Sequence, residues 1–241
     1  MLDKLGIATP TKTAAKKTCY TTASKVTGGR FDPSFYKPTF QELIEAIKKQ
    51  PYKRLREVVS FSCESWNQKD FFDVTFPYIE ISEIDIDKGE INNISNIELP
   101  EAPSRAKLIV REGDIIVSTT RPSRGAIAKI AKEQDFSIAS TGFAVVRYVD
   151  KTSITKDFLH SVLKHRLCLL QMEQRSSGGN YPAITQEELG NLLIPLPPLE
   201  IQNEIAAHIQ SVREKAKRLE TEAKAEIEQA KTEVERMILG I

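Results

Sequence analysis

The chain has 241 residues, which suits one sizeable globular domain with an appendage, or two small domains. Its 34 lysines and arginines nearly balance 33 aspartates and glutamates, so a net charge of +1 does not by itself indicate a nucleic-acid-binding protein. The charge is unevenly placed, however. Residues 1–30 carry six basic side chains against one acidic, whereas residues 199–241 carry nine acidic against seven basic. The acidic C-terminal segment therefore masks a basic remainder.

Cysteine usage and hydropathy favour a reduced, cytoplasmic protein. Cys19, Cys63 and Cys168 are odd in number and lack metal-ligand spacing. No apolar run approaches the roughly 18–20 residues that a membrane span needs. The N-terminus also lacks the apolar core of a signal peptide. We therefore expect a cytoplasmic chain without a membrane segment.

The first fifth of the chain combines a polar lead with one helix. Residues 1–30 are rich in Thr, Lys and Ala and are expected to form a flexible basic lead, with one short strand near residues 19–26. Thr39 and Glu42 then form a capping-box pattern, followed by apolar residues at helical spacing. This pattern predicts an amphipathic helix over residues 39–49.

The middle of the chain is rich in β-branched residues, which occur in short runs separated by turn signals. The predicted strands cover residues 55–61, 75–81, 107–110, 115–118, 126–131 and 142–149. Their short, irregular spacing differs from repeated βαβ units and predicts a curved, mostly antiparallel sheet.

Helices alternate with short breaks after residue 150. Thr155 is expected to cap a single helix that continues to Ser176. Thr185 begins a second capping-box pattern, which predicts a one-turn helix closed by Gly190. A short apolar strand over residues 192–194 is then stopped by prolines, and Pro198 is placed near the first turn of the last helix.

That last helix carries a heptad pattern, with apolar residues alternately four and three apart. The pattern reaches Ile227 one residue late, which should locally shift the supercoil. A rod of this length, roughly 60 Å, cannot leave its apolar stripe uncovered in water. We therefore expect it to pair with another helix. The expected contact residues are Ile205, Ile209, Val212, Ala216, Leu219, Ala223, Ile227, Ala230 and Val234.

No catalytic or metal-binding pattern emerges from the sequence. Glycine-rich phosphate loops are absent, and so is the Asn/Asp-Pro-Pro-Tyr-like tetrad expected of an adenine methyltransferase. His160, His165 and His208 all fall on predicted helices and are interpreted as surface or boundary residues. A nuclease-like Glu-x-Lys at residues 222–224 lies within the heptad helix, where a solvated face explains it. We therefore expect a chain without an active site.

Residues 118–125 have the chemistry of a DNA-contacting loop. Hydroxyls and backbone amides can bind phosphates, while an arginine fork can bind O6 and N7 of guanine. A proline limits the flexibility of the loop. The alternative is a solvated arginine turn. The candidate residues are Thr119, Thr120, Arg121, Ser123 and Arg124.

A second polar segment covers residues 175–182, where two glycines permit close approach to a ligand and an asparagine could pair with adenine. The alternative is a helix cap followed by a turn. Its candidates are Arg175, Ser176, Ser177, Asn180 and Tyr181. Arg105 and Lys107 are added as phosphate contacts. In a weaker third patch, residues 64–69, Trp66 is more simply a core residue.

Four segments together resemble specificity subunits of type I restriction–modification systems. The segment IPLPPLEIQNEI (residues 194–205) resembles the junction in this family between the recognition domain and the long helix. The segment FDPSFYKPTFQELIEAIK (residues 31–48) resembles the opening of the family's recognition domains. The segments LIVREGDIIVSTTRPSRGAIAKI and STGFAVVR, which lie within residues 108–147, resemble the central motif of the family's recognition domains. The family's SSG…PAI loop resembles residues 176–184. The resemblance covers about residues 20–240.

This resemblance implies an α+β fold: a β-rich target-recognition domain with flanking helices at residues 31–197, then one long coiled-coil-forming helix at residues 198–241. Full-length members of the family carry two recognition domains and two such helices, so this chain corresponds to a half-length form. Two copies could pair through their helices, or a second recognition chain could supply the other half. Alternatively, the chain is one half of a longer subunit.

By resemblance, the chain reads DNA while its partners perform chemistry. Methyltransferase subunits bring S-adenosylmethionine and modify adenine, and a restriction subunit cuts DNA with ATP, so this chain itself needs no cofactor. One alternative is the recognition module of a single-polypeptide restriction–modification enzyme. A different class of alternative is a coiled-coil adaptor whose sheet binds a peptide.

Overall fold

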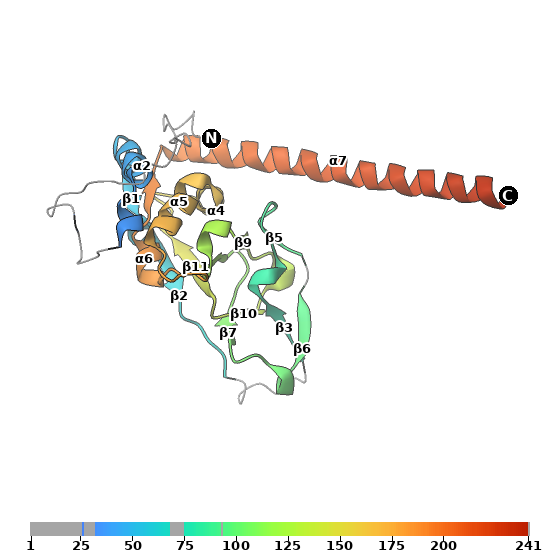
Figure 1. Cartoon of the computed structure of the whole chain (residues 1–241), viewed down its shortest axis with the longest axis horizontal. Coiled ribbons are helices and arrows are strands. Elements are labelled where there is room, and N and C mark those ends of the chain that lie inside the picture. The colour runs from blue at the N-terminus through green and yellow to red at the C-terminus, as the bar shows by residue number, and fades with distance from the viewer. Residues whose placement is uncertain (1–25, 27–31, 68–74, 93, 241) are drawn as a thin grey trace.

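The computed structural model describes residue 26 and residues 32–67, 75–92 and 94–240 (Figure 1). Most of the expected basic lead, including its short strand, therefore lies outside the described residues. A β-rich domain with helices on its surface is followed by one long helix, which confirms the predicted α+β class.

Two four-stranded sheets form the β-rich domain. The first is antiparallel throughout, with the order β2 (Val59–Ser62), β11 (Phe143–Val149), β8 (Ile115–Ser118), β9 (Ile127–Lys129). The second has the order β6 (Ser95–Glu98), β3 (Thr75–Ile79), β10 (Ile138–Ser140), β7 (Ala106–Ile109). Its β3–β10 pair is parallel. The prediction of mostly antiparallel strands is therefore confirmed.

The described residues also form two short antiparallel pairs: β1 (Tyr52–Arg54) with β12 (Leu193–Pro195), and β4 (Ile84–Asp85) with β5 (Glu90–Ile91). The β1–β12 pair closes the domain, because it joins a strand near the start of the domain to the strand just before the long helix. Within the described residues, five 3-10 turns connect the strands and helices: Pro33–Tyr36, Ile81–Glu83, Leu99–Glu101, Pro122–Arg124 and Lys132–Gln134.

The central strand β8 shows why the domain has buried side chains on both faces of its first sheet. Successive side chains of a strand point to opposite faces. Ile115 and Val117 accordingly join the core beneath the helices, whereas Ile116 joins a second core against the other sheet. Trp66 lies in a third cluster, 9% exposed, and its indole N–H donates to the carbonyl of Ala106 at 2.6 Å. The interpretation of Trp66 as a core residue is confirmed.

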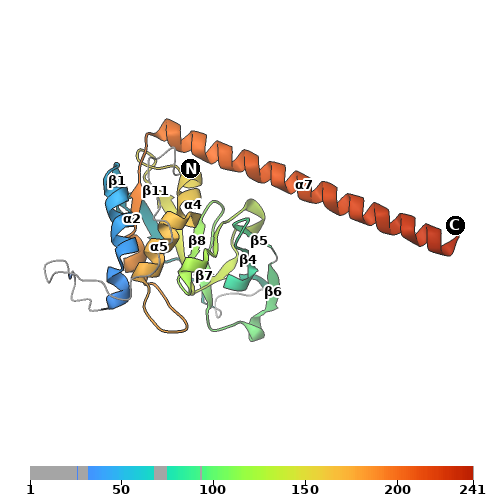
Figure 2. The same ribbon diagram turned by 45° about the horizontal axis from the view of Figure 1, so that its top comes forward.

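Helices cover one face of the first sheet (Figure 2). They are α2 (Pro38–Lys48), α3 (Leu55–Val58), α4 (Lys156–Lys164), α5 (Arg166–Arg175) and α6 (Gln186–Gly190). The predicted caps at Thr155 and Thr185 are confirmed, because each hydroxyl accepts a hydrogen bond from a backbone N–H of the first turn.

Three local predictions are wrong. The helix α2 begins at Pro38, not after a Thr39 cap, because a proline at the first helical position needs no N–H partner. Leu55–Val58 forms a helical turn instead of the start of a strand, since this places Leu55 and Val58 together in the core. The single helix predicted after Thr155 breaks at His165, which is extended and whose Nδ1 accepts from the N–H of Leu167.

One of the three histidines differs from the expected surface or boundary position. His160 is 6% exposed and therefore buried rather than at the surface or boundary. His165 lies between α4 and α5, whereas His208 is an exposed residue of the last helix.

The last helix, α7 (Leu199–Leu239), is continuous over 41 residues and leaves the domain along most of its length (Figures 1 and 2). Its first turns are anchored, because Ile205 is 3% exposed in the core and Ile209 packs against the same cluster. The buried Gln202 accepts from the N–H of Thr155 and donates to the carbonyls of Ser153 and Pro197.

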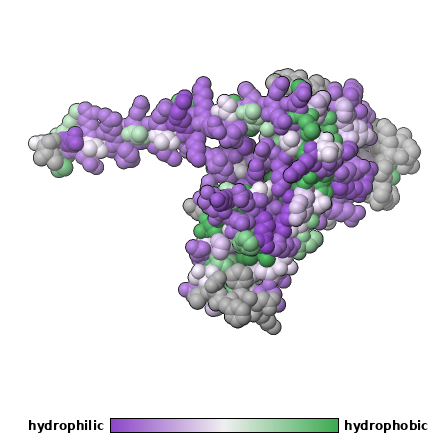
Figure 3. Space-filling view, turned by 180° about the vertical axis from the view of Figure 1, so that it is seen from behind, coloured by the Kyte–Doolittle hydropathy of each residue, from purple (hydrophilic) through white to green (hydrophobic). Residues whose placement is uncertain are grey.

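Beyond these anchors the apolar stripe of α7 is exposed. Val212, Leu219, Ile227 and Val234 are each more than half exposed. Figure 3 shows a mostly hydrophilic rod interrupted by isolated apolar side chains. In the described part of the chain, no helix combines the length and apolar character needed to cross a membrane.

Candidate nucleic-acid interface

Two loops that are about 60 residues apart in the chain form one surface at the end of β8. The N–H of Arg121 donates to the carbonyl of Pro182 at 2.7 Å, and the N–H of Ile184 donates to the carbonyl of Thr119 at 2.9 Å. Thr120 and Ala183 form an isolated antiparallel bridge. The structure therefore joins the first two predicted DNA-contacting segments. We call residues 119–125 and 176–183 together the paired loops.

Arg121 is the centre of this joint. Its backbone is left-handed (φ 48°), which is unusual for a residue with a side chain. Its guanidinium donates to the carbonyl of Asn180 at 3.2 Å and lies 4.2 Å from the ring centroid of Tyr181. Contacts from the second loop thus compensate for the strained backbone and hold the side chain in one orientation.

A tight turn follows Arg121. Pro122 is buried, and Gly125 ends the 3-10 turn at φ 80°. A Cβ on Gly125 would lie 3.5 Å from a methyl group of Leu169, so the turn packs closely on α5. This packing leaves Arg124 exposed at the surface of the loop, while Ser123 is half-buried.

The threonines mainly fasten the loop. Both the N–H and the hydroxyl of Thr119 donate to the carbonyl of Gly142, at 2.8 and 2.9 Å. The carbonyl of Thr120 accepts from the hydroxyl of Ser118 at 2.7 Å. These bonds tie the loop to the turn between β10 and β11 and so position Arg121.

The tip of the second loop is exposed. Ser177 exchanges two backbone hydrogen bonds with Ala183, and Gly178 adopts φ 101° in the tight turn between them. Asn180 and Tyr181 lie beyond this closure, and Tyr181 is 71% exposed. The geometry therefore presents an aromatic ring next to the Arg121 guanidinium, with the exposed Asn180 as its neighbour in the chain.

Arg175 and Ser176 occupy the base of this loop. Arg175 forms an ion pair with Glu188 at 2.6 Å, with its side chain only 17% exposed. The Ser176 hydroxyl donates to the carbonyl of Met172 at 2.7 Å and so ends α5. Their contacts support the loop from within, in agreement with the helix-cap alternative for these two residues.

Arg105 and Lys107 are exposed next to and on β7. The carbonyl of Arg105 accepts from the N–H of Thr141, and the adjacent Gly142 accepts from Thr119. The backbone at Arg105 is thereby connected to the paired loops. Among the described residues, Arg105, Lys107, Arg121 and Arg124 have no ion-pair partner, so their charge is available to a ligand.

Sequence reasoning missed an ion-pair network beneath β7, β8 and β11. Arg147 pairs with Glu64 and with Asp114 (2.9 Å), and Arg111 also pairs with Glu64. The hydrogen bond from Arg111, together with the bond from Arg147, lowers the pKa of Glu64 to about 2 against the opposing effect of burial. The sequence signal that could have revealed this network was Arg147, a charged residue within the apolar strand at residues 143–149, which needs an acidic partner. Glu64, from the weak third patch, is therefore a structural residue.

Arg111 also covers an exposed aromatic side chain. Its guanidinium lies 3.6 Å from the ring centroid of Phe136, whose backbone is left-handed (φ 63°) and which is 60% exposed.

Within the described residues, no group of three or more His, Cys, Asp or Glu side chains gathers as a metal site.

A β-rich domain that presents joined cationic loops and continues into a long helical arm defines a recognition module, and comparison with known proteins identifies its family. Residues 49–229 match the family described as type I restriction modification DNA specificity domain, and the chain belongs to this family. The predicted relationship to type I specificity subunits is confirmed.

Individual relatives of known function support the same family. The chain is 24% identical over 216 residues to the type I restriction enzyme MjaVIII specificity subunit of Methanocaldococcus jannaschii, covering 88% of this chain and 50% of that protein. It is 27% identical over 142 residues to the HindI specificity subunit of Haemophilus influenzae, covering 58% of this chain and 29% of that protein. The chain thus spans at most about half the length of these curated relatives.

Solved structures show the same fold. The HsdS subunit from Thermoanaerobacter tengcongensis superimposes with a TM-score of 0.61 at 34% identity, covering 70% of this chain and 43% of that one. A chain from a study of complex assembly and conformational transition of the type I R-M system gives 0.62 at 35% identity, with coverages of 72% and 45%.

Proposed function

We propose that this chain reads one half-site of a bipartite DNA sequence for a type I restriction–modification complex, using the domain at residues 31–197. The observation that carries the proposal is the joint between the paired loops, where Arg121 is stacked on Tyr181 and bonded to Asn180. An oriented guanidinium can discriminate guanine by a bidentate contact, worth roughly 1–3 kcal/mol. Family membership supplies the nucleic-acid class.

The residues of this surface divide between base reading and positioning. Arg121 and Asn180 are proposed to contact bases, because both project from rigidly closed turns. Arg105, Lys107 and Arg124 are proposed to contact phosphates, since they are exposed cations without ion pairs. Ser123, Ser177 and Tyr181 flank these contacts. Thr119, Thr120, Arg175 and Ser176 position the loops.

The exposed part of α7 is proposed to pair with a second helix. Ile205 and Ile209 are occupied by the chain's own core, so the available stripe begins at Val212. In an antiparallel pair of identical helices, a stripe from Val212 to Ile238 would be centred near residue 225. Val212 would then face the Met237–Ile238 region of the partner. Such a symmetric pair would read an inverted repeat, whereas a different recognition chain would give an asymmetric site.

The chemistry is proposed to reside in partner subunits. Methyltransferase subunits would bind S-adenosylmethionine and modify adenine, and a restriction subunit would use ATP. This chain would contribute recognition and spacing in the cytoplasm, with no cofactor of its own. The relatives include a type I restriction enzyme specificity subunit and a chain from a type I R-M system, which supports this division.

The test is sequence-specific DNA binding by the purified complex with the methyltransferase. Arg121→Ala should weaken binding to the cognate duplex. Arg218→Ala is a matched control, because Arg218 is an exposed arginine of α7 whose ion pair among the described residues is with Glu222, one turn along the same helix. If both variants bind the cognate duplex like the parent, the paired loops do not read DNA.

A further inference from the structure

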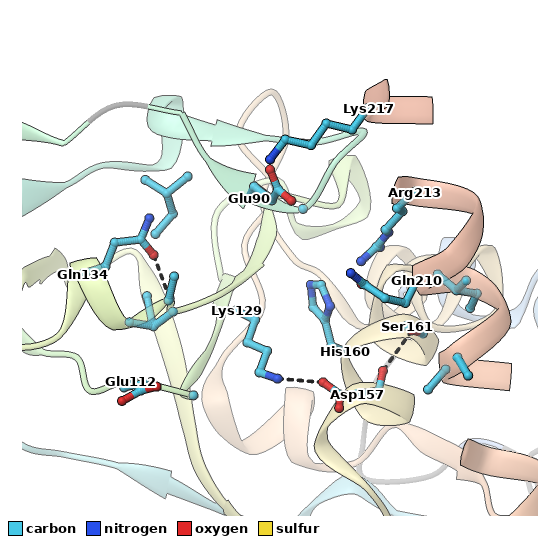
Figure 4. A pocket seen from close by; sticks show the side chains of 18 of the residues that line it. Glu90, Glu112, Lys129, Gln134, Asp157, His160, Ser161, Gln210, Arg213 and Lys217 are labelled. Atoms are coloured by element: carbon cyan, nitrogen blue, oxygen red, sulfur yellow. Dashed lines mark hydrogen bonds and ion pairs between the residues drawn. The ribbon is translucent and has the colours of Figure 1, made fainter. Parts of the chain in front are cut away.

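A groove separates the arm from the domain. It has a volume of about 1050 Å³ and lies between α4, the region of the β4–β5 hairpin and α7 (Figure 4). Figure 2 shows the α5–α6 loop, which carries part of the proposed DNA surface, projecting from the domain away from α7. The groove is therefore distinct from the paired loops.

A histidine and an arginine face each other in this groove, and neither has a counterion or a hydrogen-bonded anion among the described residues. His160 of α4 is 6% exposed, and its Nε2 is buried without a hydrogen-bond partner. Arg213 of α7 lies opposite, and the two side chains point toward one another in Figure 4. In the part of the chain that the structure describes, the Arg213 guanidinium has no ion pair. A buried polar group without a partner is costly, and the half-buried Arg213 brings an unpaired positive charge to the same place.

The carboxylates that line the groove do not fill this role. Asp157 is bonded to Lys129 at 2.6 Å. Glu112 lies toward the opposite wall from Arg213 in Figure 4, and Glu90 lies near the end where Lys217 projects. Each acid is thus either paired or directed elsewhere.

The surroundings of His160 are electrostatically positive, which favours an anion in the groove. Burial, then the charges of Arg213, Lys164 and Lys129, lower the pKa of His160 to about 4, so the ring is neutral near pH 7. Lys164 shows the same influence, because burial and then Arg213 lower its pKa to about 8. The hairpin acids Asp85, Asp87 and Glu90 act in the opposite direction on Lys164 without restoring its ordinary value.

We propose that this groove binds an oxyanion group, a carboxylate or a phosphate, between His160 and Arg213. One oxygen would accept from the Nε2–H of His160 while the guanidinium binds the charge, so both donors are satisfied together. Either source of the group has this chemistry: a free phosphate species, or an acidic side chain of an assembling protein.

Occupation of the site would tie α7 to α4. Arg213 lies one turn beyond Ile209, where the buried anchors of α7 end. Past this point, the ion pair of Lys88 with Glu220 at 2.9 Å is an exposed contact that stabilises little. A bound oxyanion would therefore stiffen the direction in which the arm leaves the domain.

The experiment uses the full chain and inorganic phosphate, with sodium acetate as the carboxylate probe and sodium chloride at matched ionic strength as the reference. Thermal unfolding is measured for the parent, Arg213→Gln and the matched control Arg218→Gln. Phosphate or acetate at several times its dissociation constant should raise the midpoint of the parent and of Arg218→Gln by roughly 2–4 °C. Arg213→Gln should lose this shift, and Arg213→Lys should retain part of it if the glutamine variant fails to fold.

Imidazole NMR gives a readout that a purely structural role would not change. The ring nitrogen signals of His160 should move on titration, while those of the exposed His208 stay fixed. A response to phosphate alone identifies a phosphate species as the ligand, and a response to acetate identifies a carboxylate. The proposal is overturned if neither anion shifts His160, or if Arg213→Gln responds like the parent.

Discussion

The guanidinium of Arg121 lies 4.2 Å from the ring centroid of Tyr181, so two loops about 60 residues apart share one cation–π contact at the protein surface. The same guanidinium donates to the carbonyl of Asn180, which restricts it further. A side chain held before DNA arrives loses less conformational entropy on binding. The contact would therefore prepare Arg121 for the base contact proposed above before DNA arrives.

Replacing Arg121 by alanine should reduce affinity for the cognate duplex by roughly 5- to 150-fold, since a bidentate base contact is worth about 1–3 kcal/mol. Affinity for unrelated duplexes should fall less, so discrimination is lost. Fluorescence anisotropy with both duplexes measures the difference. The Arg218→Ala control should match the parent, and an equal loss on both duplexes would assign Arg121 to phosphate binding instead.

Arg124 is predicted to act through charge. Arg124→Gln should weaken binding to every duplex to a similar extent and reduce the slope of log affinity against log salt by about 1, because one phosphate contact is removed. Salt titrations of the parent and variant test this. A slope that does not change would remove Arg124 from the interface, and a parent without steep salt dependence would favour the peptide-binding alternative.

Ile205 and Leu219 share the heptad stripe of α7 but should respond differently to alanine. Ile205 is 3% exposed in the domain core, so Ile205→Ala should lower the free energy of unfolding by about 2–5 kcal/mol. Leu219 is 51% exposed, so Leu219→Ala should leave the domain stable and weaken helix pairing.

Chemical denaturation and sedimentation separate these two effects. The stronger change Leu219→Pro should abolish assembly, because proline breaks the helix. A correctly assembled, fully active complex carrying Leu219→Pro would contradict the pairing of α7.

Acid should weaken the domain through Glu64. Its folded pKa of about 2 lies below the ordinary value of 4.5, so its contribution to stability is present above about pH 4.5 and is lost as the pH falls toward 2. Glu64→Gln should lower stability near neutrality and flatten the unfolding free energy across that pH window. Denaturation at several pH values tests this, and parallel curves for parent and variant would exclude Glu64 as the titrating group.

The regular elements were accessible from sequence because local patterns determine them. The apolar run at 115–118 and the caps at Thr155 and Thr185 occur as predicted. The one-turn helix at Leu55–Val58 escaped prediction, because core packing overrides the strand propensity of valine. The break at His165 depends on an imidazole that replaces a missing helical partner, which no periodicity reveals.

The site was accessible only in pieces. Both candidate segments were selected for their residue types, but their junction depends on backbone bonds between Arg121 and Pro182 that only the tertiary fold brings together. The sequence likewise predicted that the whole apolar stripe of α7 contacts another helix. In the structure, its first residues, Ile205 and Ile209, pack against the chain's own domain core. Heptad spacing identifies an apolar face without identifying what covers it.

The most direct test of the recognition role is genome-wide methyladenine mapping in a host that lacks this gene, complemented with the parent chain or with Arg121→Ala. We expect methylation of one bipartite motif to disappear on deletion, to return with the parent, and to be weakened or relaxed with Arg121→Ala. A palindromic motif would indicate two copies of this chain. An identical methylation pattern in all of these strains, with the partner methyltransferase active, would contradict the account.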